Sequence, residues 1–227
     1  MTRDEAVTLI KQRLGNNTNP DLDQQIINEM VHVQEFLLEG EDFIPWFLLK
    51  EEAATLANIN EPRLELPEDF LHEWEEGCLY LVKPGATLQQ TSYIPLIKDD
   101  YDVIRNRHYG YGTPCAYDFA GNFFWLAPIP DAAHQLRMVY YGKAESLATQ
   151  NIENVWLKYA ADWFIGEVGT IIAGQYQQSD KQVPQFVAQA ARGKQRTLVR
   201  HISHQEVNKR RIVGGIDYGF GRSNGTW

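Results

Sequence analysis

The stretch from Gly112 to Tyr141 constrains the fold most strongly, because it has the pattern of three short strands joined by turns. Aromatic and β-branched residues fill the runs at 117–119, 123–127 and 136–141. Gly121-Asn122 separates the first two runs, and glycine can take the positive φ of a tight hairpin. Pro128-Ile129-Pro130-Asp131 separates the last two, and proline cannot continue a central strand. The pattern predicts a three-stranded meander.

Strand-like runs also precede this stretch, so we expect a β-rich region over residues 43–150. The runs are at 47–49, 53–57, 63–66, 70–82 and 93–97. Pro95 in the last run predicts an edge strand, because proline has no N–H to donate. Asp99 or Asp100 can cap one short helix through Tyr101 and Ile104 to His108.

Two helices are expected within residues 1–42. Thr2 and Glu5 have the spacing of a capping box, and Gly15 is a suitable stop. The apolar face of this first helix is Ala6, Leu9, Ile10 and Leu14. Asp21 with Gln24 offers a second cap, and that helix closes near Gly40. Its apolar face is Leu22, Ile26, Met30, Val33 and Leu37.

Two long helices are expected within residues 151–210. Asn154 can cap a helix that runs from Val155 to about Gln175, and the glycines inside it indicate close packing. These glycines are Gly166, Gly169 and Gly174. Pro184 suits the first turn of a polar helix that runs to about Asn208. Its narrow apolar face, formed by Phe186, Ala190, Leu198 and Ile202, is typical of an exposed or partner-contacting helix.

Residues 211–227 form an expected extended tail. Five glycines between positions 214 and 227 exclude a packed core, yet aromatic residues recur among them. This composition predicts a segment that orders on a partner, and the alternative is a frayed terminus.

Charge is unevenly distributed along a chain whose net charge is -9. The segment from Arg192 to Arg222 holds eight basic and two acidic residues, a net of +6, which leaves -15 for the rest. The overall acidity argues against general affinity for nucleic acid. This uneven distribution of charge favours contact of the basic C-terminal segment with the acidic remainder of the chain, within one copy or between copies.

The motifs of the common enzyme classes are not found. The chain has no glycine-rich phosphate loop and no Gly-x-Ser-x-Gly turn. His201 and His204 lie three residues apart on the last helix, but no third ligand near them completes a metal site, so exposed polar positions are expected. Adjacent carboxylates such as Glu75-Glu76 are typical of solvated surfaces. We therefore expect no enzyme, no cofactor and no metal.

Two further expectations concern the compartment. No apolar run approaches the ~20 residues of a membrane helix, and residues 1–5 do not begin a secretion signal, so we expect no membrane contact. Cys78 and Cys115 both fall in strand-like runs and are expected to be buried thiols, with a disulfide between them as the alternative.

Six motifs in a fixed order resemble the head-to-tail adaptor (connector) proteins of tailed bacteriophages, over roughly Thr2 to Asn208. They are Leu66-Pro67-Glu68-Asp69-Phe70-Leu71; Tyr93-Ile94-Pro95-Leu96-Ile97; Gly112-Thr113-Pro114 with Tyr117; Leu126-Ala127-Pro128-Ile129-Pro130-Asp131; Leu136 with Tyr140-Tyr141; and Asn154 with Trp156-Leu157. The tail after Arg210 matches none of them.

The resemblance implies an α+β chain. Its helical ring-forming part would be the N-terminal helix pair plus two long C-terminal helices, with an inserted antiparallel β-sheet region and an extended C-terminal tail. It further implies a homo-oligomeric ring, usually of twelve copies, that binds the portal protein at the neck of a virion assembled in the host cytoplasm. Tail or nozzle proteins would dock on this ring, and genomic DNA would pass through its lumen without sequence-specific binding.

For portal contact we single out Arg210, Arg211, Ile216, Tyr218, Phe220 and Trp227. Two other interpretations remain open. A β-rich carbohydrate- or receptor-binding module predicts a cleft with exposed Trp74, Trp125 or tyrosines, which are Tyr109, Tyr111, Tyr117, Tyr140 and Tyr141. An enzyme predicts a pocket that holds at least two carboxylates or histidines at catalytic distances.

Overall fold

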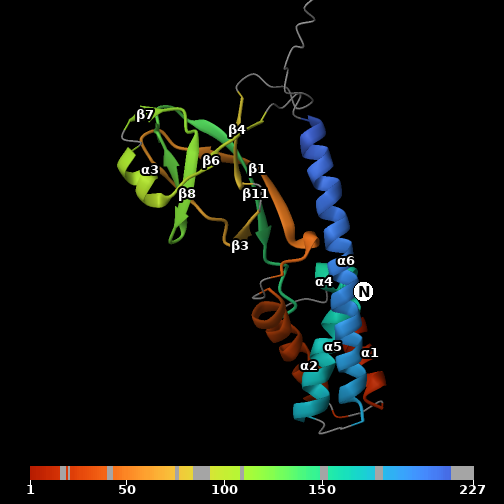
Figure 1. The fold of residues 1–227 in the computed structure, drawn as a ribbon. Coiled ribbons are helices and arrows are strands. Elements are labelled where there is room, and N and C mark those ends of the chain that lie inside the picture. Colours follow the sequence, from red (N-terminus) through yellow and green to blue (C-terminus); the bar gives the residue numbers. More distant parts are fainter. Residues whose placement is uncertain are drawn as a thin grey trace, which may run out of the picture. The chain divides into compact units, whose positions relative to one another are not determined.

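The computed structural model describes residues 1–15, 19, 21–39, 43–74, 77–83, 93–107, 110–148, 153–176 and 181–215, without the side chains at 36–37, 51–56, 106–107 and 205–215. The chain divides into two compact units. The helical unit combines Met1–Phe47 with Ser146–Trp227, and the sheet unit is Leu48–Glu145 (Figure 1). Helices and antiparallel sheets together confirm the α+β class.

The helical unit begins with α1 (Arg3–Arg13), whose predicted capping box is confirmed. Thr2 Oγ1 accepts a hydrogen bond from the Glu5 backbone N–H at 3.4 Å, and the Thr2 N–H donates to Glu5 Oε2 at 2.9 Å. Gly15 has a φ of +87°, so the predicted glycine stop is also confirmed. The α1 side chains Ala6, Val7 and Ile10 are buried.

The second helix is α2 (Asp21–His32), which continues as the π-helical turn η1 (Val33–Leu38). Four of its predicted core residues, Leu22, Ile26, Met30 and Val33, are buried, whereas the Leu37 side chain lies outside the described part. The predicted cap at Asp21 is wrong by two residues. Asp21 is already helical, and its N–H donates to the Asn19 carboxamide oxygen at 3.1 Å.

The helix predicted from Val155 to Gln175 is interrupted. Asn154 caps α4 (Val155–Tyr159) as expected, through a 2.8 Å bond from the Trp156 N–H. Ala160 then leaves helical geometry, before α5 (Ala161–Ile171) and the π-helical turn η3 (Ile172–Tyr176). In an unbroken helix, two residues seven positions apart, such as Trp156 and Trp163, would be separated by about 10 Å along the axis. The break allows the buried rings of Trp156 and Trp163 to meet edge to face at 5.7 Å.

The sheet unit contains two larger sheets. One has the order β1-β11-β4-β5, with β3 also pairing with β11, and the other has the order β2-β9-β8-β6. The bounds are β1 (Leu49–Ala57), β2 (Arg63–Glu65), β3 (Phe70–Glu73), β4 (Leu79–Val82), β5 (Tyr93–Pro95), β6 (Ile97–Lys98), β8 (Ala116–Ala120), β9 (Phe123–Ala127) and β11 (His134–Gly142). The helix α3 (Tyr101–Arg107) confirms the predicted short helix, and Asp100 Oδ1 accepts from the Asp102 N–H at 3.0 Å.

The predicted meander is only half correct. The β8–β9 hairpin is confirmed, with Ala120 opposite Phe123 and a φ of +65° at Gly121. The third strand, β11, lies in the other sheet, between β1 and the strands β3 and β4. Between β9 and β11 the chain forms β10 (Ile129–Pro130), which pairs in parallel with β7 (Tyr111–Gly112). Pro128 and Pro130 have no N–H to donate, so the chain cannot return directly along β9.

The core of the sheet unit is formed by residues of both larger sheets. Leu79, Leu81, Leu136 and Met138 from one sheet cluster with Leu64, Tyr117, Phe124 and Leu126 from the other. The expected edge strand at Pro95 is confirmed, since β5 ends one sheet. The adjoining β6 ends the other sheet and pairs in parallel with β8, so the region is not wholly antiparallel. Cys78 is buried as expected, but Cys115 is exposed, and both are free thiols.

Candidate partner-binding surfaces

Helix α6 (Val183–Gly215) carries two of the six residues singled out for portal contact, Arg210 and Arg211. Pro184 lies in its first turn, where a missing N–H costs nothing because first-turn N–H groups have no helical partner. Its buried side consists of Phe186, Ala190, Gly193, Thr197 and His201, spaced three or four residues apart. In Figure 1, α6 is the long blue helix.

Glycines bring α5 and α6 into backbone contact. A Cβ atom at Gly166 of α5 would lie 2.4 Å from the Ala190 nitrogen, and one at Gly169 would lie 2.1 Å from Phe186 Cδ1. Both distances are too short for real atoms, so the prediction that these glycines mark close packing is confirmed. It is wrong for Gly174, where the nearest atom is Val183 Cγ2 at 3.8 Å.

The predicted apolar face of α6 is wrong beyond Ala190. Leu198 and Ile202 are 42% and 49% exposed, while Thr197 and His201 take the buried positions. Gly193 explains the difference, because it presses against the Trp163 backbone and fixes which side of α6 faces α5. Val187, Leu198, Val199 and Ile202 therefore leave apolar surface exposed on α6.

Histidine and aromatic rings pack at the described end of this helix. His204 stacks on Trp46 with ring centroids 3.8 Å apart, and His201 meets Phe43 edge-on at 4.9 Å. The expectation that both histidines are exposed is wrong for His201, which is buried. In the part of the chain that the structure describes, no group of three or more His, Cys, Asp or Glu residues is placed to hold a metal ion.

A groove of about 690 Å³ runs beside the first half of α6. We call it the basic groove, and its lining residues are Arg13, Asp162, Pro184, Gln185, Phe186, Ala188, Gln189, Arg192 and Arg196. It holds three guanidinium groups and one carboxylate. Sequence reasoning missed Arg13 and Asp162, because only tertiary packing brings the last turn of α1 and the first turn of α5 to α6.

Polar contacts connect the groove residues. Arg13 Nη1 donates to Gln189 Oε1, and Gln189 Nε2 donates to Asp162 Oδ1 at 3.3 Å. Arg196 Nη1 donates to Asp162 Oδ2 at 2.9 Å. Arg192 Nε donates to the Ala188 carbonyl at 3.1 Å. The single carboxylate therefore already has two partners, and the net formal charge of the groove is positive.

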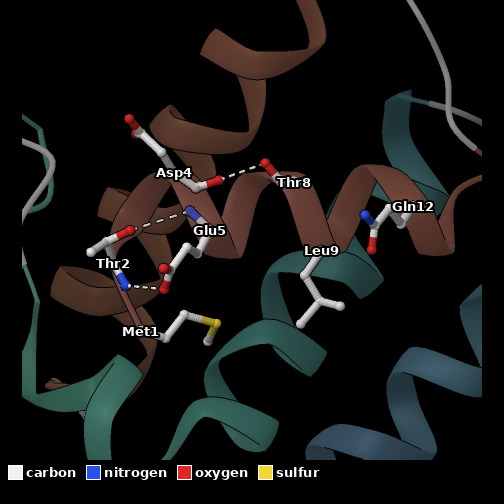
Figure 2. A pocket seen from close by; sticks show the side chains of 7 residues that line it. All are labelled: Met1, Thr2, Asp4, Glu5, Thr8, Leu9 and Gln12. Carbon is white, nitrogen blue, oxygen red and sulfur yellow. Dashed lines mark hydrogen bonds between the residues drawn. The ribbon is translucent and has the colours of Figure 1, made fainter.

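A second hollow, which we call the α1 hollow, lies along α1, and its charged side chains are acidic. It measures about 670 Å³ and is lined by Met1, Thr2, Asp4, Glu5, Thr8, Leu9 and Gln12. Figure 2 shows the Glu5 carboxylate turned back to Thr2 by the capping box, while the Asp4 carboxylate points away. Glu5 is therefore occupied in holding the helix start, and Asp4 Oδ1 accepts from Arg3 Nε at 3.1 Å.

The structure leaves the predicted portal-contact residues untested. Arg210 and Arg211 lie within α6, but their side chains are outside the described part. Ile216, Tyr218, Phe220 and Trp227 lie outside the described residues altogether. They stay a prediction.

The sheet unit buries most of the aromatics that a sugar-binding face would need. Trp74, Tyr117, Tyr140 and Tyr141 are buried, and Trp125 is half-buried. Tyr111 is 69% exposed, and Tyr109 lies outside the described residues. None of the described helices combines the length and apolar character needed to cross a membrane.

Comparison with known protein families identifies the chain's family. The model of a family described as SU10 adaptor protein, a family of phage head-to-tail adaptors, matches residues 1–211. No curated protein matches the chain. The matched range includes all of the sheet unit and ends within α6, so residues 212–227 lie beyond it.

Proposed function

The chain belongs to the SU10 adaptor protein family of phage head-to-tail adaptors, and we propose that it forms a ring of twelve copies on the portal protein of a virion. The family match over residues 1–211 is the observation that carries the proposal. The ring would be a docking platform for tail or nozzle proteins and a conduit for DNA. These roles are mechanical and need surfaces that fit, with no reaction to catalyse.

The helical segments 1–42 and 151–210 are the proposed ring-forming part. The exposed apolar residues of α6, such as Leu198, Val199 and Ile202, support this assignment. Isolated apolar side chains are ordinary on a protein surface, but a row of them on one exposed helix marks a surface that fits a partner. A closed ring needs two different surfaces on each copy, one for each neighbour.

Portal contact is proposed for the end of α6 and the tail. Arg210 and Arg211 precede the aromatic residues Tyr218, Phe220 and Trp227 in a glycine-rich segment. Arginine and aromatic side chains dominate the binding energy of many protein interfaces. Glycines between them would let the segment follow the surface of its partner as it orders.

The surface that faces the tail proteins and the surface that lines the lumen remain to be assigned. Residues 43–150 are proposed to face the tail or nozzle proteins. Outside Arg192–Arg222 the chain carries a net charge of -15. Acidic groups on the lumen would repel DNA phosphates and prevent the genome from adhering as it passes.

The test uses the full chain and the portal ring of the same phage in a co-sedimentation assay. One variant is truncated after Arg211, and a second carries Y218A, F220A and W227A. A matched control carries S223A and N224A in the same tail. We expect the full chain and the control to sediment with the portal, and both other variants to stay in the supernatant. Sedimentation of the truncated chain equal to that of the full chain would overturn the assignment of portal contact to the tail.

A further inference from the structure

The basic groove has more positive charge than its own carboxylate can neutralise. Arg13, Arg192 and Arg196 line it, and Asp162 is the one acidic side chain among the lining residues. Asp162 already accepts from Arg196 at 2.9 Å and from Gln189 at 3.3 Å. The net positive charge of the groove would attract a further anionic group.

The arginines also have hydrogen-bond donors to spare for a ligand. A guanidinium group carries five N–H donors in a planar fork that fits a carboxylate or a phosphate. Among the described contacts, Arg13 donates to Gln189 and Arg192 donates to the Ala188 carbonyl, one bond each. Both contacts hold the side chain in the groove while leaving most of its donors for an incoming anion.

We propose that the basic groove binds carboxylate side chains of the neighbouring copy of this chain. This inference rests on the ring of the proposed function. In a ring, one surface of each copy meets a different surface of the next copy. Because the chain outside Arg192–Arg222 carries a net charge of -15, an acidic surface is what a neighbouring copy presents most readily to the groove.

Outward carboxylates are present on the helical unit itself. Asp4 and Glu153 are 57% and 53% exposed at their side chains, and in one copy they pair with Arg3 Nε at 3.1 Å and with the N-terminal amine at 3.3 Å. A DNA phosphate would offer the same chemistry to the arginines, but the acidic body opposes its approach, so phosphate contact is the competing outcome of the test.

The first experiment reverses charge in the assembled complex. R192E with R196E reverses two groove charges, and K194E with R200E makes the same change in charge on α6 outside the groove lining. Circular dichroism confirms that each variant is folded. Native mass spectrometry with the portal ring then counts the copies bound. We expect at least a tenfold loss of full rings for the groove variant and less than a twofold loss for the control.

The second experiment identifies the anion. R192K keeps the charge and supplies an amine that a carbodiimide joins to a carboxylate in direct contact. Mixing isotope-labelled with unlabelled chains separates links between copies from links within one copy. We expect a link from position 192 to an acidic residue of another copy, and the same link from an R196K variant.

The other possible results distinguish failure of the groove inference from failure of the proposed ring. Full rings of the R192E/R196E variant, or equal loss in the K194E/R200E control, would overturn the groove inference and leave the proposed ring intact. A link to the portal protein, or a groove variant that forms rings but no longer contacts DNA, would replace the neighbouring copy with that partner. A wild-type chain that forms no ring on the portal would overturn the proposed function and this inference with it.

Discussion

A Cβ atom built on Gly193 of α6 would lie 2.2 Å from the backbone nitrogen of Trp163 in α5. The two helices therefore touch backbone to backbone, and the side of α6 opposite this contact is the side left for partners. The exposed residues Leu198, Val199 and Ile202 lie away from this contact, whereas the basic groove lies beside it, where Asp162 of α5 and Arg13 of α1 meet α6.

G193A should destabilise the helical unit by about 2 kcal/mol or more, because the added methyl forces α6 away from α5. Urea denaturation followed by circular dichroism measures the change in the free energy of unfolding. G174A is the matched control, because the added Cβ would make only an ordinary van der Waals contact, with Val183 Cγ2 at 3.8 Å. Alanine also favours a helix over glycine by up to about 1 kcal/mol. Equal stability of G193A and wild type would contradict the backbone contact.

D69N should weaken the sheet unit at neutral pH and less so in acid. Burial raises the pKa of the Asp69 carboxyl, but hydrogen bonds from Lys50 and Tyr140 outweigh it and hold the pKa below the ordinary 3.8. The stabilisation by the ionised carboxylate is therefore complete above about pH 4 and is lost as pH falls through the folded pKa.

The measurement for Asp69 is the free energy of unfolding from pH 2 to pH 7. We expect D69N to be about 1 kcal/mol less stable at pH 7, given the partial exposure of this ion pair, and its acid slope to be shallower. E68Q, at the neighbouring exposed carboxylate, is the control and should keep the wild-type stability at pH 7. An unchanged slope in D69N would show that the Lys50–Asp69–Tyr140 contacts do not form.

Y117F should cost about 1–3 kcal/mol of stability, because it removes the partner of a buried donor. The Tyr117 hydroxyl accepts the Cys78 backbone N–H at 2.8 Å, and both residues are fully buried. Y111F is a suitable control because Tyr111 is 69% exposed. Thermal unfolding of the two variants gives the comparison, and equal midpoints would argue against this hydrogen bond.

The two thiols should react very differently. Burial raises the pKa of the Cys78 thiol to about 12, and the side chain is inaccessible, whereas Cys115 is exposed. At pH 8 a disulfide reagent should titrate one thiol in the native chain and two in denaturant. C115S should show none until it unfolds. Two rapidly reacting thiols in the native protein would be inconsistent with the packing of β4.

Local patterns predicted most helix starts, because a cap depends on residues within one turn, although the cap at Asp21 was wrong by two residues. The Thr2–Glu5 capping box and the Asn154 cap are both confirmed. The same holds for the Gly121 hairpin, whose backbone requirement is local. Contacts between segments that are far apart in the sequence could not be predicted in the same way. The strand β11 pairs with Leu49–Ala57, about eighty residues earlier, and nothing near Pro128 identifies that partner.

The surface of α6 was mispredicted for a related reason. Hydrophobicity favours Leu198 and Ile202 for the buried side, but the close approach at Gly193 buries Thr197 and His201. Thr197 satisfies its hydroxyl by donating to the Gly193 carbonyl at 3.0 Å. The basic groove joins residues of three helices, so sequence spacing alone could not indicate it.

The central claim is that this adaptor forms a ring on the portal, and the most direct measurement is the native mass of the complex. Purified chain and portal ring from the same phage are mixed and weighed. We expect one adaptor per portal subunit, twelve copies in all. A chain that stays monomeric beside an intact portal ring, and is instead retained on glycan or cell-surface material, would contradict the claim and favour a binding module.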